Sequence, residues 1–125
     1  MIEIKHNNRE LSLGMICHFI TLSGLLIPFG NFLFPIILLI LYQRKSEYIS
    51  YHAKESLNFQ ISFTVLGILL VIFIFAIAFD DLVVFTGALI GAFLLIFYFM
   101  QIINAAMAAK KDEFFKYPLT IRIIR

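Results

Sequence analysis

Residues 57–109 read LNFQISFTVLGILLVIFIFAIAFDDLVVFTGALIGAFLLIFYFMQIINAAMAA, and this stretch decides the fold. Its only charges are Asp80 and Asp81, which divide it into apolar runs of 23 and 28 residues. A helix needs about 20 apolar residues to cross a hydrocarbon core of about 30 Å, so each run is long enough to cross once. Because one aspartate at the centre of a crossing costs about 2.5–3.5 kcal/mol, the acidic pair marks a turn in water. We therefore predict a transmembrane hairpin with helices at about 57–79 and 82–109.

The composition of the whole chain agrees with a membrane protein. Of its 125 residues, 62% are hydrophobic and 14% are charged, whereas globular domains average about 45–50% and about 25%. The net charge of +2 is too small to indicate a nucleic-acid partner, so the lipid bilayer is the expected partner. The single cysteine, Cys17, excludes an intrachain disulfide and a set of thiol ligands for zinc.

A second uncharged block, residues 11–42, is too long for one straight crossing, since a single helix would measure about 48 Å. Pro28-Phe29-Gly30-Asn31, followed by Pro35, supplies a break, because glycine and asparagine suit the left-handed conformation of a tight turn. We predict two limbs, at about 11–27 and 32–43. The second limb rises only about 16 Å, and the sequence leaves open whether it spans the membrane or is re-entrant.

The predicted fold is therefore an all-α polytopic membrane bundle of four transmembrane or near-transmembrane helices, forming a single domain over residues 1–125. A cytoplasmic loop is expected at 44–56 and a cytoplasmic tail at 110–125. Because the chain enters and leaves the first block on the same side of the membrane, all ten lysines and arginines share one face, as the positive-inside rule requires. We expect a multi-pass protein of the cell inner (plasma) membrane with both termini in the cytoplasm.

Polar side chains within the apolar helices indicate where the helices pack together. Counting the helical rise from the cytoplasmic ends places four of them at similar depth, and we predict that they form a hydrogen-bonded cluster: His18, Gln60, Gln101 and Asn104. Such a cluster either holds the bundle together or forms a polar path for an ion or substrate. The Gly87-xxx-Gly91 spacing predicts a close approach of another helix.

A second polar group lies where the third helix enters the membrane. It consists of His52, Glu55 and Asn58, which we expect at the cytoplasmic edge on the side that faces protein. His52 and Glu55 are one helical turn apart, but the repeated Glu-x-x-His motifs of a di-iron bundle are missing, so we predict no metal site and no cofactor. We expect Tyr117 to anchor in the headgroup region and residues 119–123, which alternate in polarity, to be extended.

Four stretches together resemble a bacterial family of small four-helix membrane proteins of unknown function, distantly related to the Tic-type import channel subunit of the chloroplast inner envelope. They are residues 16–18 (ICH), 27–31 (IPFGN) with Pro35, 52–60 (HAKESLNFQ) and 117–122 (YPLTIR). The chain departs from the family pattern at Tyr51, where an acidic residue is common, and at Ser56, where alanine is common. The resemblance implies four membrane helices and supports a hairpin in the first block, but it provides no catalytic or ligand residues.

These observations favour an integral membrane protein that is not an enzyme and acts through helix packing, as an accessory or assembly subunit. Its partners would be other membrane proteins or further copies of itself. The alternative is a component of a membrane transport or protein-translocation channel, which would require oligomerisation because four short helices enclose little space.

Overall fold

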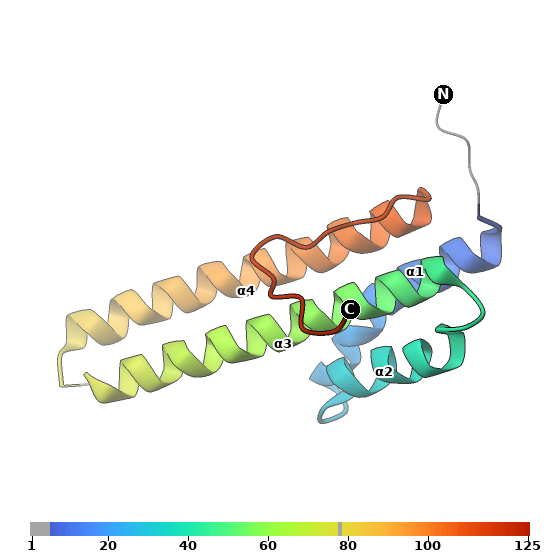
Figure 1. The fold of residues 1–125 in the computed structure, drawn as a ribbon. Coiled ribbons are helices and arrows are strands. Elements are labelled where there is room, and N and C mark those ends of the chain that lie inside the picture. The colour runs from blue at the N-terminus through green and yellow to red at the C-terminus, as the bar shows by residue number, and fades with distance from the viewer. Residues whose placement is uncertain (1–5, 78) are drawn as a thin grey trace.

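The computed structural model describes residues 6–77 and 79–125, and within them every regular element is a helix (Figure 1). The elements in chain order are α1 (Asn8–Phe19), the 3₁₀-helix η1 (Ile20–Leu25), α2 (Gly30–Tyr42), α3 (Glu47–Ala76) and α4 (Asp81–Lys110). The predicted all-helical class is confirmed for this part of the chain.

Helices α3 and α4 form the long hairpin that residues 57–109 predict. Each has 30 residues and they run side by side in opposite directions (Figure 1). Asp80 caps α4, since its Oδ1 accepts a hydrogen bond of 2.9 Å from the backbone N–H of Leu82. Within the described residues, these two helices are long and apolar enough to cross a membrane. The expected set of four transmembrane or near-transmembrane helices is not confirmed.

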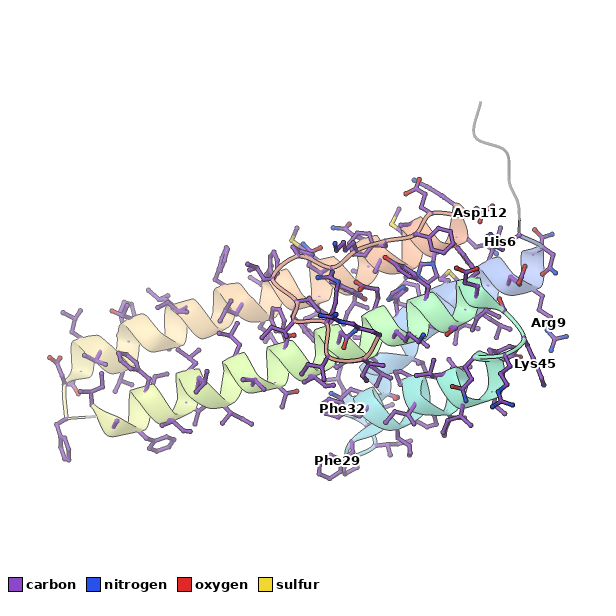
Figure 2. The ribbon with its side chains drawn as sticks, viewed as in Figure 1. His6, Arg9, Phe29, Phe32, Lys45 and Asp112 are labelled. Carbon is purple, nitrogen blue, oxygen red and sulfur yellow. The ribbon has the colours of Figure 1, made fainter. Side chains whose placement is uncertain are left out.

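The first block folds back on itself as predicted, but by a different turn. Phe29 takes the left-handed conformation, with φ of 62°, and it lies exposed at the hairpin apex (Figure 2). Gly30 instead permits a close approach to η1, because an added Cβ would lie 2.7 Å from Ser23 Oγ and 3.1 Å from the Ser23 carbonyl. Glycine is therefore needed here for space rather than for backbone conformation.

The predicted loop at 44–56 is wrong for most of its length, because α3 already begins at Glu47. Ser46 caps the helix, with its Oγ accepting a hydrogen bond of 3.3 Å from the backbone N–H of Ile49. The polar residues of this segment interrupt the hydropathy pattern, but they do not interrupt the helix because α1, α2 and α4 pack around it (Figure 1).

The tail after α4 has no regular structure and crosses over α3 (red in Figure 1). Residues 48–60 of α3 are almost all buried beneath the tail and the neighbouring helices, whereas α3 beyond residue 64 is mostly exposed and apolar. The molecule thus has an enclosed half around the start of α3 and an open half formed by α3 and α4 alone. Figure 2 places Arg9, Lys45 and Asp112 together at the enclosed end.

Close packing of α1 depends on Gly14. An added Cβ there would lie 2.9 Å from the Tyr48 ring and 3.3 Å from the His52 ring. We expect Gly14→Leu to lower the stability of the protein by about 1–3 kcal/mol through overpacking. Thermal unfolding in detergent, followed by circular dichroism, should show a lower midpoint. The matched control is Ala92→Leu on the exposed face of α4, and an equal loss there would contradict the explanation.

Candidate functional site

The buried polar side chains gather in the enclosed half, where α1, α3 and the tail meet. His18 and His52 are fully buried, and Asn58 and Gln60 are 1% and 2% exposed. Polar groups removed from water in this way require hydrogen-bond partners. The hydrogen-bond partners of these four side chains show which segments the site joins.

His18 joins three segments through both nitrogens of its ring. Its Nδ1 lies 2.7 Å from the Tyr117 hydroxyl, and its Nε2 lies 2.8 Å from Nδ1 of His52. Burial raises the pKa of the Tyr117 phenol well above its usual value, so the hydroxyl stays protonated and donates to His18. We assign the hydrogen bonds accordingly, with Nε2–H of His18 donating to His52. In the reverse direction the Tyr117 hydroxyl would have no acceptor within the described residues, whereas Nε2 of His52 has no hydrogen-bond partner there in either direction.

Glu55 holds the tail against α3. Its carboxylate accepts hydrogen bonds from the backbone N–H of Tyr117 at 3.0 Å and from the Arg122 guanidinium at 2.8 and 3.1 Å. The same guanidinium donates to the Tyr117 carbonyl at 2.8 Å. Because the Glu55 side chain is only 6% exposed, this is a largely desolvated ion pair reinforced by backbone contacts.

Asn58 continues the attachment one turn further along α3. Its Nδ2 donates to the Ile124 carbonyl and its Oδ1 accepts from the Ile124 N–H, both at 2.8 Å. The side-chain amide thereby pairs with the extended backbone as a neighbouring strand would. Ser62 adds a hydrogen bond of 2.9 Å from the N–H of Ile121 to its Oγ.

A separate polar group ties together α2, α3 and α4. Oε1 of Gln60 accepts hydrogen bonds from Asn31 Nδ2 at 3.2 Å and from the Tyr98 hydroxyl at 2.7 Å. Nε2 of Gln60 is buried and has no hydrogen-bond partner in the described residues.

The four residues of the predicted cluster do not come together. His18 and Gln60 are buried but belong to separate networks, Gln101 is half-buried and Asn104 is exposed on α4. Neither Gln101 nor Asn104 has a side-chain hydrogen bond in the described part of the chain. The helical rise per residue predicts how deep in the membrane a residue lies, but it does not predict which neighbouring helix its side chain faces. This explains why the predicted cluster does not form.

The other predicted site residues have identifiable contacts. His52, Glu55 and Asn58 face protein and bind α1 or the tail. Gly87 lies where α4 touches α3, because an added Cβ would be 2.7 Å from Ile74, whereas Gly91 has only Leu70 nearby, at 3.8 Å.

Sequence reasoning missed the tail's side of the network. Tyr117 is 1% exposed rather than at a membrane interface, and Arg122 was counted only as a positive charge. The alternating polarity of residues 119–123 predicted that the tail is extended, but it did not predict that the tail packs against α3. In the described residues, no group of three or more His, Cys, Asp or Glu side chains could hold a metal ion.

Residues 9–124 match the profile of one protein family, MamF/MmsF, described as the magnetosome magnetite crystal formation protein family. The match covers α2, α3 and α4, all of α1 except its first residue, and nearly the whole tail. It supports the resemblance to a bacterial family of small membrane proteins but not the relation to the Tic-type subunit. No curated protein and no solved structure matches the chain.

The Tyr117–His18 hydrogen bond should contribute to stability. Tyr117→Phe removes the donor and leaves a buried nitrogen unpaired, which costs about 1–3 kcal/mol. We expect a lower midpoint of thermal unfolding. Tyr42→Phe is the control, because no hydrogen bond involves the Tyr42 hydroxyl in the described residues, and an equal effect of both changes would exclude the assigned role.

Glu55→Ala should release the tail. Hydrogen bonds to charged groups contribute about 1.5–3 kcal/mol each, and this change removes three of them. We expect trypsin to cleave after Lys116 and Arg122 at least about tenfold faster, the equivalent of 1.4 kcal/mol of opening free energy. The exposed Glu47 provides the control Glu47→Ala, which should leave the cleavage rate unchanged. Unaltered cleavage in Glu55→Ala would show that the carboxylate does not hold the tail.

Proposed function

Because this chain belongs to the magnetosome magnetite crystal formation protein family, we propose that it is a membrane-anchored accessory or assembly protein of magnetite crystal formation that acts without catalysis. The observation that carries this proposal is the division of the molecule into an enclosed polar half and an open apolar half. Each half has properties that fit a different task.

The open half fits a membrane anchor. Its apolar side chains point outward, as in Phe75 and Phe93, which are 76% and 67% exposed. Exposed apolar surface of this extent is stable in lipid and unstable in water. We propose that α3 and α4 cross the bilayer and that the α1–α2 hairpin enters and leaves on one side, since α2 with 13 residues rises only about 20 Å.

The charge distribution supports an orientation for this anchor. Asp80 and Asp81 lie at the turn between the crossing helices, while Arg9 and Lys45 lie at the opposite end, from which the tail runs back over α3 (Figures 1 and 2). Under the positive-inside rule, the enclosed half and both termini face the cytoplasm. We propose a multi-pass protein of the inner membrane or of a magnetosome membrane with the same orientation.

The enclosed half fits a rigid platform for assembly rather than an active site. Two histidines are buried. Both ring nitrogens of His18 are engaged by Tyr117 and His52, while Nδ1 of His52 is engaged by His18 and its Nε2 is buried away from solvent. A general base needs a free nitrogen within reach of a substrate. Glu55 is likewise occupied by Arg122 and the tail backbone. The polar groups hold segments together, which favours an accessory role.

The test uses a magnetite-forming bacterium from which its own members of this family have been deleted. Expression of the chain should restore the crystal diameters measured by electron microscopy, because the proposed role is in crystal formation. Glu55→Ala should fail to restore them, since a released tail disrupts the platform, whereas Glu47→Ala should succeed. Immunoblots of the membrane fraction must show equal levels of all three proteins.

Unchanged crystals in the presence of normal levels of the unmodified protein would contradict the proposal. Ion conductance of the purified protein in liposomes, together with unchanged crystals, would favour the channel alternative instead.

A further inference from the structure

We infer that the groove between α3 and α4 binds one acyl chain of a membrane lipid, whose ester carbonyl accepts a hydrogen bond from Gln60. The groove has a volume of about 340 Å³, within the range of about 300–1,000 Å³ typical of small-molecule sites. Asn31, Gln60 and Tyr98 form its polar end, and Gly67, Val71 and Gly91 lie further along its wall. This inference goes beyond the proposed function and rests only on the insertion of α3 and α4.

Two glycines show that the space between the helices is not closed by the chain itself. A Cβ added at Gly67 would meet nothing within 4 Å, and one added at Gly91 would meet only Leu70 at 3.8 Å. Gly87 contrasts with both, because there Ile74 would be 2.7 Å away and the helices touch. Glycine in a helix interior costs about 1 kcal/mol relative to alanine, and no contact within the chain accounts for that cost at Gly67.

Gln60, which lines the polar end of the groove, carries a hydrogen-bond donor that is unpaired within the described part of the chain. Oε1 of Gln60 is occupied by Asn31 and Tyr98, while its Nε2 has no partner in the described residues although the side chain is 2% exposed. A buried amide without a partner costs about 1–3 kcal/mol. An ester carbonyl accepts without donating, and it is therefore the complementary group.

The depth and direction of the groove match a lipid in the leaflet on the side of the chain termini. Gln60 is the last residue of the buried stretch of α3, which is mostly exposed and apolar from residue 64 onward, so the polar end of the groove lies at the boundary between the enclosed and the open half. From Gln60 to Val71 the helix rises about 16 Å, close to half of a hydrocarbon core of about 30 Å. The polar end thus lies near the headgroups and the apolar end near the bilayer midplane.

The test uses the full chain in nanodiscs that contain a phosphatidylethanolamine with a diazirine halfway along one acyl chain. After illumination, mass spectrometry of peptides measures the yield of lipid adducts at each residue. We expect adducts on Thr64 and Leu94 in the groove, in addition to those on the outward-facing Phe93. Gly67→Leu and, from the opposite wall, Gly91→Leu should each lower the groove adducts at least about tenfold, because a filled groove leaves no space for the chain.

The matched control is Ala92→Leu, which adds the same side chain at the same depth but on the exposed face of α4. It should leave the groove adducts unchanged, and circular dichroism should show equal helix content in all variants. Groove adducts at the level of the unmodified protein in both Gly67→Leu and Gly91→Leu would overturn the inference. The inference would also be overturned if the unmodified protein showed no groove adducts and sedimented as a dimer, because a second copy of the chain would then occupy the groove. Neither result depends on magnetite formation, so this test and that of the proposed function can fail separately.

Discussion

The structure depends on one constraint, which is that the polar residues on the first half of α3 are removed from water and must still be hydrogen-bonded. Glu55 is the residue that most depends on such partners. Its carboxylate accepts hydrogen bonds from both the Arg122 guanidinium and the backbone N–H of Tyr117. A buried carboxylate without such partners would destabilise the fold strongly. The tail is therefore part of the core, and it brings the Tyr117 hydroxyl to His18.

This constraint also separates the two halves of the molecule. Where α3 carries polar residues, other segments enclose it and satisfy them. Where α3 carries only apolar residues, nothing in the described chain covers it except α4, and the two helices touch at Gly87 but leave a groove beside Gly67 and Gly91. A bilayer can cover such a surface without directional contacts, which is why the open half needs no further protein of its own.

The sequence predicts the local features of this chain better than the contacts between its helices. The α3–α4 hairpin and its acidic turn follow from the lengths of two apolar runs, and a break near Pro28 follows from local chain chemistry. The start of α3 was misplaced because hydropathy reports the environment of a helix and not its extent. The predicted grouping of His18, Gln60, Gln101 and Asn104 failed because equal depth does not imply a shared face, and Asn104 is turned outward.

The sequence by itself therefore determined the all-helical class, the two long apolar helices and the turn between them, because these depend on residues that are close together in the chain. Only the tertiary structure decided that Tyr117, His18 and His52 meet, that Arg122 pairs with Glu55, and that a groove lies beside Gly67. The hydrogen bonds among them join residues separated by 34 to 99 positions. Their formation depends on how helices rotate and pack against one another, which a local pattern of hydrophobic residues does not encode.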